Sequence, residues 1–395
     1  MKQPFAVAAH FNGGPDEAAL KTWATGLRAQ LDAPAVSLGL VFLTPACFER
    51  AREILEVLRV HAQVPLLAGC SSGSLVANGR EIEDDSGLVL ALYHLPGAEL
   101  KLFRISQDQL DESNGPASWH SETGLDAEQA RGWLAFADPF TFDAERWLKD
   151  WNAAYPAQPV VGGLASGPHA ANATQLYLNG DVLDDGAVAI AVGGDVKLAS
   201  VISQGCEPIG ETGVVTKADR NFIHEIGTRP AYQHLVEAFQ SLPESAQAEA
   251  RGRLHVGLVI NEYLEDFHRG DFLIRNLLGA DPAGGSVAIG AVPRLGQTIQ
   301  FQRRDAEAAT EDMAALLTRA KDQLRGQLIY GGVLCCCNGR GTHLFGKPNH
   351  DAAMVQSELG PLALAGFFCN GELGPVGERN FVHGFTASLG LFVKA

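Results

Sequence analysis

Two stretches of the sequence repeat each other at a constant separation of 94 residues. Each stretch carries a Pro-x-x-Phe motif and, further on, a Gly-x-x-Ser-Gly motif. From Pro45 to Gly69 is 24 positions, and from Pro139 to Gly163 is also 24. A repeated supersecondary unit cannot bury its apolar face alone, so it packs against its copies. This repeat therefore constrains the fold more than any other feature of the chain.

Each copy is predicted to run strand, helix, strand and Gly/Ser loop. Apolar residues at helical spacing, such as Ile54, Leu55 and Leu58, indicate the helix of the first copy. We expect a β-hairpin to follow each loop, because two apolar runs there are separated by Gly97 or by Gly193 and Gly194. The predicted hairpin strands are 88–92 with 100–105, and 187–192 with 197–202.

A looser third copy lies near the C-terminus. Its predicted order is strand 327–336, loop 338–341, helix 349–359, strand 362–368 and loop 369–375. The fold class that follows is α/β, a two-part chain with mixed β-sheets flanked by helices and built from repeated β-α-β-loop-hairpin units. We expect a domain over residues 1–220, with repeats at about 30–107 and 125–203, and a second over 221–395.

Composition excludes several classes of protein. The net charge is -16, and no Lys/Arg cluster offers the basic face that a nucleic acid or an anionic membrane would need. No stretch reaches the roughly 18 apolar residues of a membrane span, and no secretory signal opens the chain. The seven cysteines are odd in number and form no CxxC pair, which predicts a reducing, cytoplasmic environment and no zinc ribbon.

The two loops of the third copy should be neighbours. Parallel strands joined by a helix place their C-terminal loops at the same sheet edge, where α/β proteins bind ligands. Within the run Cys335–Cys337, side chains alternate along the strand, so Cys336 should point away from the other two, which argues against a metal site. Cys337 ends the strand beside Arg340, and a nearby cation favours the reactive thiolate.

This edge predicts a site for a zwitterionic small molecule. Arg340 would hold the carboxylate of the ligand, and Glu372 would hold its ammonium group. A structural ion pair between Arg340 and Glu372 is an equal alternative, and Arg275 with Asp305 is expected to form another internal pair. The residues predicted to contact the ligand are Cys70, Ser71, Ser72, Arg275, Cys337, Asn338, Arg340, Cys369, Asn370 and Glu372.

With these motifs the chain resembles the FIST proteins, a family named for F-box and intracellular signal transduction. The resemblance covers roughly residues 30–393 and includes both the N-terminal and the C-terminal FIST regions. It rests on the segments 69–73, 162–167, 223–231, 272–276, 300–305, 337–341 and 366–375.

The resemblance implies a sensory module of a signalling system, similar to stand-alone bacterial members. Such a module would bind a small polar ligand and pass its state to an output protein in trans, since the chain has no F-box or output domain. Some relatives are similar to haem-binding nitric-oxide sensors, which makes a haem-based gas sensor the first alternative.

Neither the haem alternative nor an enzyme is favoured by the residues themselves. No C-x-x-C-H motif is present, so a haem group would have to be bound non-covalently. No other cofactor is expected. The histidines to consider are His169, His224, His268, His343 and His383. A cysteine-dependent enzyme or thiol redox sensor that uses Cys337 is the second alternative. A serine hydrolase is disfavoured because a hairpin region, rather than a helix, follows Ser72.

Overall fold

The computed structural model describes residues 3–12, 16–168 and 173–395. It divides into two compact units. Unit 1 comprises the described residues of 1–202, 313–382 and 386–395, and unit 2 comprises 203–312 and 383–385. The predicted domain boundary near residue 220 stays a prediction.

Unit 1 contains three six-stranded mixed sheets that share one plan. Sheet 1 has the order β1 (Ala6–Asn12), β6 (Gly87–Tyr93), β2 (Leu38–Leu43), β3 (Leu67–Ser71), β10 (Leu176–Leu178) and β11 (Asp181–Leu183). Sheet 2 has the order β7 (Ala98–Ile105), β12 (Ala187–Gly194), β8 (Ala130–Ala137), β9 (Val160–Leu164), β23 (Glu372–Val376) and β24 (Arg379–His383). Sheet 3 has the order β13 (Val196–Gln204), β25 (Thr386–Lys394), β21 (Ile329–Cys337), β22 (Leu364–Cys369), β4 (Leu75–Ala77) and β5 (Arg80–Ile82).

The plan reveals three repeats that exchange hairpins. In each sheet a central parallel pair, β2–β3, β8–β9 or β21–β22, is followed by a short hairpin from a different repeat. The hairpin β4–β5 of the first repeat completes sheet 3, β10–β11 of the second completes sheet 1, and β23–β24 of the third completes sheet 2. The exchange is cyclic, so each repeat needs the other two to finish its sheet.

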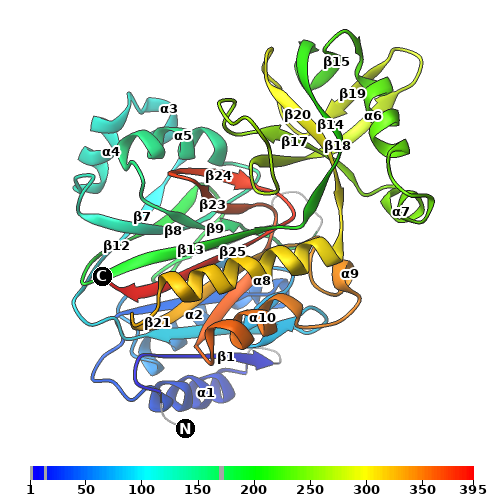
Figure 1. Ribbon diagram of the computed structural model, residues 1–395. Coiled ribbons are helices and arrows are strands. Elements are labelled where there is room, and N and C mark those ends of the chain that lie inside the picture. Colours follow the sequence, from blue (N-terminus) through cyan, green and yellow to red (C-terminus); the bar gives the residue numbers. More distant parts are fainter. Residues whose placement is uncertain (1–2, 13–15, 169–172) are drawn as a thin grey trace. The chain divides into compact units, whose positions relative to one another are not determined.

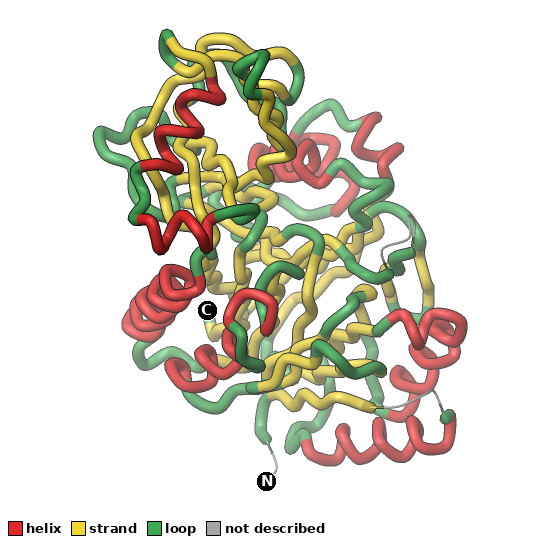
Figure 2. The backbone as a smooth tube through the Cα atoms, turned by 90° about the vertical axis from the view of Figure 1, so that its right-hand side faces the viewer, coloured by secondary structure: helices red, strands yellow, loops and turns green. Residues whose placement is uncertain are grey.

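The three sheets share one apolar core and carry helices on their outer faces. One cluster of buried residues takes side chains from all three sheets, while three further clusters lie between a sheet and its helices. In Figure 2 the helices lie outside the strands. Helices α1 (Glu17–Gln30) and α2 (Ala51–His61) cover sheet 1, and a 3-10 turn, Pro45–Arg50, precedes α2. Sheet 2 is covered by α3 (Gln107–Glu112), α4 (Pro116–Thr123) and α5 (Ala144–Ala154). Sheet 3 is covered by α10 (His350–Leu359) and by α8 (Ala306–Gln323) from Met313 onward, and the short α9 (Thr342–Phe345) precedes α10 (Figure 1).

Three phenylalanines meet in the shared core. Phe42 lies 4.8 Å from Phe367 and 5.5 Å from Phe136, and Phe136 lies 5.7 Å from Phe367, between ring centroids. Each parallel pair supplies one ring opposite a small residue at the same register: Phe42 faces Cys70, Phe136 faces Gly163, and Phe367 faces Cys335. The ring therefore lies in the first strand of the pair in the first two repeats (β2 and β8) and in the second strand, β22, in the third.

Unit 2 is built around a closed sheet with its own core. The strand order is β14 (Cys206–Asp219), β20 (Thr298–Arg304), β17 (Leu254–Val259), β18 (Phe272–Asp281), β19 (Ser286–Ile289), β15 (Phe222–Ile226) and β16 (Arg229–Pro230), with α6 (Ala231–Gln240) and α7 (Glu244–Ala250) beside it. An additional pairing of β14 with β15 closes the sheet. Buried residues of these strands and of α6 form a separate core.

The predicted fold class is confirmed, but the predicted hairpins are wrong. β6 pairs with β1 and with β2, and β12 pairs with β7 and with β8. Because both edges of β6 and of β12 are occupied, the strands that follow them, β7 and β13, join the next sheet instead. The exchanged hairpins of the first two repeats turn at Asn78-Gly79 and Asn179-Gly180, a sequence typical of tight β-turns, with φ of 54° and 56° at the two asparagines.

Equivalent glycines in the three parallel pairs are predicted to be irreplaceable. A Cβ on Gly69, Gly162 or Gly366 would lie 1.7–1.8 Å from a carbonyl oxygen of the neighbouring strand. Each change to alanine should lower the free energy of unfolding by about 3 kcal/mol or more, measured by urea denaturation. Gly73→Ala is the matched control, because no atom lies within 4 Å of its Cβ position. Equal stability of all four variants would contradict the shared strand register.

Candidate functional site

The ends of β21 and β22 bring the two predicted loops together. Cys337 and Cys369 are register partners in the two strands. Immediately beyond them, Nδ2 of Asn338 donates to Oδ1 of Asn370 at 2.8 Å, and the Asn338 N–H donates to the carbonyl oxygen of Cys369 at 3.1 Å. Both asparagines are exposed and Cys337 is half-buried. The neighbourhood inferred from the parallel strands is therefore present.

Beneath the asparagine pair lies a thiol–carboxyl cluster, formed by Cys337, Cys369 and Glu372. The Cys369 thiol donates to Oε1 of Glu372 at 3.3 Å, and Cys337 also hydrogen-bonds this carboxyl group. The other oxygen, Oε2, accepts the N–H of Thr386 at 3.0 Å. Two thiols from adjacent strands thus converge on one buried carboxyl group.

Burial favours the uncharged forms of Glu372 and Cys369. Burial raises the pKa of Glu372 to about 8, although the Thr386 N–H and the Cys369 thiol favour the ionised form. Burial, together with the nearby Glu372, raises the pKa of the Cys369 thiol well above its usual value. Glu372 is therefore mostly protonated at neutral pH, which removes the anion expected to bind a ligand ammonium group.

Arg340 has a partner that the sequence did not predict. Its Nε and Nη2 donate to the two carboxylate oxygens of Asp351 at 2.6 and 2.8 Å. Exposure of the two side chains is 0% and 1%. Burial disfavours the charge of Asp351, but Arg340 outweighs it and holds the pKa of Asp351 well below its usual range. Nε and Nη2 of Arg340, which were expected to hold a ligand carboxylate, are occupied by this buried internal pair.

Aromatic rings enclose this ion pair. Phe345 lies 5.3 Å from the guanidinium carbon of Arg340 and stacks on His350 at 3.5 Å between ring centroids. Nδ1 of His350 lies 3.0 Å from Oδ1 of Asp351. Asp351 stands at the start of α10, eleven positions after Arg340, and no spacing rule in the sequence pointed to it.

The Gly/Ser loops of the first two repeats meet in a loop hub, formed by Ser71, Ser72, Ser166 and Phe368. Hydroxyls of Ser72 and Ser166 donate to the Phe368 carbonyl oxygen at 2.7 and 2.5 Å. The Ser71 hydroxyl donates to the Ser166 carbonyl oxygen at 2.9 Å. All three serines are at most 2% exposed, and Cys70 is fully buried in the core. These hydroxyls connect the three repeats to one another.

Arg275, the remaining predicted residue, belongs to unit 2. It lies in β18, where its Nη1 donates to the Ile274 carbonyl oxygen at 3.0 Å. Asp305 lies 3.4 Å from Nη2 of Arg303, so it pairs with a different arginine from the expected one. A ligand-binding role for Arg275 stays a prediction.

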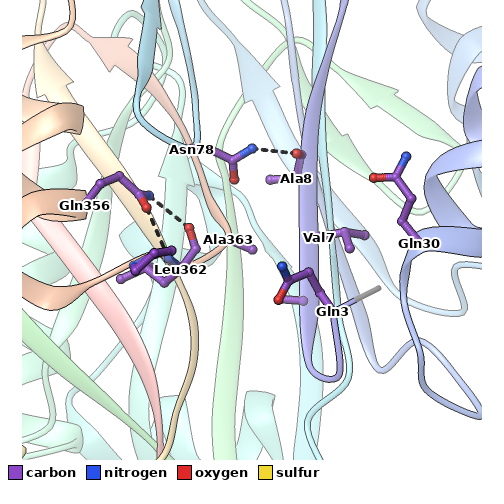
Figure 3. Close-up of a pocket in the computed structure, with 10 residues that line it drawn as sticks. Gln3, Val7, Ala8, Gln30, Asn78, Gln356, Leu362 and Ala363 are labelled. Atoms are coloured by element: carbon purple, nitrogen blue, oxygen red, sulfur yellow. Dashed lines mark hydrogen bonds between the residues drawn. The ribbon is translucent and has the colours of Figure 1, made fainter. Parts of the chain in front are cut away.

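A separate amide pocket of about 280 Å³ lies beside the edge strand β1 (Figure 3). Nδ2 of Asn78 donates to the Ala8 carbonyl oxygen at 2.9 Å, and Nε2 of Gln356 donates to that of Leu362 at 2.9 Å. Of the described residues that line it, none carries an ionisable side chain. They are Gln3, Ala6, Val7, Ala8, Gln30, Asn78, Gln356, Pro361, Leu362 and Ala363.

The haem alternative stays untested, and the structure shows how the candidate metal-binding side chains and histidines are placed. In the described part of the chain, no group of three His, Cys, Asp or Glu residues is arranged to hold a metal ion. Of the histidines considered for haem, His268 and His343 are exposed, His224 is half-buried, His383 is buried, and His169 lies outside the described residues. Among the described helices, none has the length and apolar character that a membrane crossing requires.

Comparison with known proteins identifies the family. The sequence matches the FIST N domain over residues 37–229 and the FIST C domain over residues 230–375. The chain belongs to the FIST family. An uncharacterized protein of Mycobacterium bovis is 38% identical to this FIST chain over 367 residues, 93% of each chain. One from Mycobacterium tuberculosis H37Rv is 37% identical over 367 residues, 93% of this chain and 94% of the relative.

More distant comparisons of this FIST chain carry no functional conclusion. An uncharacterized protein of Methanocaldococcus jannaschii is 21% identical over 263 residues, 65% of this chain and 49% of the relative. A solved structure of a cyanuric acid hydrolase aligns over 99% of this chain and 98% of its own, with a TM-score of 0.36 and 8% identity.

Glu372 should make the stability of the FIST chain depend on pH. Its pKa is raised from 4.5 to about 8 in the folded state, so the folded protein retains a proton that the unfolded chain releases. The free energy of unfolding should therefore fall as pH rises through this interval. Glu372→Gln should flatten the slope by up to about 1.4 kcal/mol per pH unit.

Urea unfolding followed by tryptophan fluorescence measures this effect in unit 1, which contains all five tryptophans. Glu81, whose pKa is raised to about 7, contributes in the same direction and should leave a smaller residual slope in the variant. Glu378→Gln, on an exposed residue of the turn after β23, is the matched control and should keep the parent slope. An unchanged slope in Glu372→Gln would show that Glu372 is ionised in the folded protein.

The buried pair of Arg340 and Asp351 predicts a large stability difference. Asp351→Asn leaves the buried guanidinium without its carboxylate and should cost about 3–5 kcal/mol. Asp322→Asn breaks an Arg–Asp pair of similar length, 2.6 Å to Arg325, in which the side chains are 61% and 82% exposed. That control should cost less than about 1 kcal/mol. Similar losses for both, measured by the same urea unfolding, would contradict the internal role assigned to Arg340.

Proposed function

We propose that this FIST chain is the sensory part of a signalling system and binds a small, uncharged polar molecule in the amide pocket. Membership of the FIST family supports the sensory role. The observation that carries the choice of site is a cavity of about 280 Å³ whose lining residues include four carboxamide side chains and no ionisable one. An output protein in trans would read the bound state.

The chemistry of the amide pocket favours a ligand that itself carries an amide or a similar neutral group. A carboxamide offers both a donor and an acceptor, as does the backbone of an edge strand. Neither Gln3 nor Gln30 hydrogen-bonds through its side chain to the other lining residues (Figure 3). A charged ligand would find no counter-charge in this lining and would be penalised by desolvation.

This ligand class differs from the zwitterion expected from the sequence. The fork of Arg340 is occupied by Asp351, and Glu372 is mostly protonated. An amino-acid amide or a comparable neutral metabolite fits the pocket better than a free amino acid. Ligand contacts at Asn338 and Asn370 stay the second candidate, because these two side chains are exposed at the predicted sheet edge.

The position of the amide pocket supports a role in signalling. Its lining comes from β1, from the tip of the hairpin β4–β5 at Asn78, and from the segment between α10 and β22. These belong to sheet 1 and sheet 3, which are joined through the exchanged hairpin. A ligand that contacts all three segments would favour one relative placement of the two sheets, and such a difference between states is what a partner protein can recognise.

A thermal-shift screen with amino acids, amino-acid amides and small neutral metabolites tests this proposal. A ligand that binds the native state raises the melting temperature with its concentration. Gln3→Ala and Gln30→Ala should each weaken the binding of a hit about 2- to 12-fold, the equivalent of one neutral hydrogen bond. Gln323→Ala, an exposed glutamine on α8, is the matched control and should bind like the parent.

The set of variants that lose affinity for the ligand identifies the binding site. If Asn338→Ala alone weakens binding, the ligand binds at the loops after β21 and β22 instead. Equal binding by all variants would refute both placements. A stoichiometric Soret band in the purified protein, lost on changing one histidine, would replace the proposal with a haem-based gas sensor.

A further inference from the structure

Cys337 and Cys369 have the placement that a disulfide requires. They are direct register partners in adjacent parallel strands. Neighbouring strands lie about 4.8 Å apart, which is within the range of about 4.4–6.8 Å between the Cα atoms of disulfide-bonded cysteines. Their side chains point to the same side of the sheet, because both thiols hydrogen-bond Glu372.

The two thiols differ in access to solvent. Cys337 is half-buried, whereas Cys369 is fully buried. The guanidinium of Arg340 interacts electrostatically with Cys337. This division corresponds to an attacking cysteine at the surface and a resolving cysteine behind it.

The other five cysteines lack these features. Each of them is buried. Cys336 faces the opposite side of the sheet, where its thiol lies 3.8 Å from Asp351. Cys70 and Cys335 lie in the shared core, and Cys47 is packed between sheet 1 and its helices. The pair at the strand ends is therefore distinguished by register, access and a shared carboxyl group.

We propose that Cys337 and Cys369 form a reversible disulfide by exchange with low-molecular-weight disulfides, so that unit 1 acts as a thiol redox sensor. The oxidant is a disulfide of the glutathione class, RSSR. This activity is independent of ligand binding in the amide pocket.

The exchange proceeds in two balanced steps. The Cys337 thiolate, its proton released to water, attacks RSSR, forming a Cys337–SR mixed disulfide and releasing RS⁻. The ionised form of Glu372, which is the minor form at neutral pH and increases as pH rises toward its pKa of about 8, then accepts the proton of the Cys369 thiol through their existing hydrogen bond. The Cys369 thiolate attacks the Cys337 sulfur, the Cys337–SR bond breaks, and a second RS⁻ leaves. Two protein thiols are oxidised and one RSSR is reduced to two thiols.

A disulfide in sheet 3 would also affect the packing of sheet 2. Cys369 packs against Gly163 of β9 so closely that a Cβ on that glycine would lie 2.9 Å from both Cβ and Sγ of Cys369. Glu372 pairs with Gly163 in sheet 2. A change in the rotamer of Cys369 therefore bears directly on strands of two repeats, which gives the redox state a structural output.

Intact-mass spectrometry under non-reducing conditions, after incubation with oxidised glutathione, tests the proposal. The parent should lose the mass of two hydrogens, and peptide mapping of the same sample should show a Cys337–Cys369 link. Cys369→Ser should accumulate a glutathione adduct at Cys337, and Cys337→Ser should not react. Cys47→Ser is the matched control and should behave like the parent.

Glu372→Gln separates the two steps. It should leave the first step intact and prolong the mixed disulfide about 10-fold or more, since the proton acceptor of Cys369 is lost. A parent that keeps a stable glutathione adduct, or an internal disulfide that persists in either single cysteine variant, would overturn the proposal. Because the link is mapped in the parent protein, misfolding of a variant cannot decide the outcome.

Discussion

The contact of Phe42, Phe136 and Phe367 is the interaction on which the architecture of unit 1 depends. Ring centroids 4.8–5.7 Å apart join the three parallel strand pairs at one point of the shared core. Each pair supplies one ring opposite a small residue at the same register, which is Cys70, Gly163 or Cys335. The core therefore fixes the register of all three repeats at once, and the exchanged hairpins add backbone pairing between them.

The shared core also determines which polar side chains at the strand ends are used in structural hydrogen bonds and which can react. Within two residues of the ends of β3 and β9, the first two repeats bury the hydroxyls of Ser72 and Ser166 in the loop hub, where both donate to the Phe368 carbonyl oxygen of the third repeat. The third repeat instead carries Cys369 and Glu372, with Cys337 beside them. The two thiols and the carboxyl group thus lie where the sequence of the third repeat differs from that of the first two. A change in Cys369 or Glu372 therefore acts close to the loop hub, where all three repeats meet.

Much of this could be predicted from sequence because it depends on local pattern. The β-α-β units follow from apolar spacing, and the meeting of the loops at Cys337 and Cys369 follows from parallel connection. The exchanged hairpins could not be predicted in the same way, because strand pairing between repeats leaves no trace in local periodicity. In two of the three hairpins the turn is nevertheless indicated by an Asn-Gly pair, Asn78-Gly79 or Asn179-Gly180.

The polar partners were harder to predict than the elements. Arg340 was recognised as a residue that needs a carboxylate, yet Asp351 lies in a helix and approaches it only through the packing of α10. Similarly, the sequence identified Glu372 but not its protonation, which follows from complete burial beside two thiols. Both outcomes depend on tertiary contacts, and together they move the expected ligand from a zwitterion to a neutral molecule.

Amide hydrogen exchange, read by mass spectrometry, tests most directly whether the three repeats form one cooperative core. We expect peptides from β2, β8 and β21 to exchange at a common slow rate. Phe42→Leu should accelerate the exchange of all three by a similar factor, because the ring supports each sheet. Acceleration confined to residues 38–71, with β8 and β21 unchanged, would contradict the claim that the aromatic contact unites the repeats.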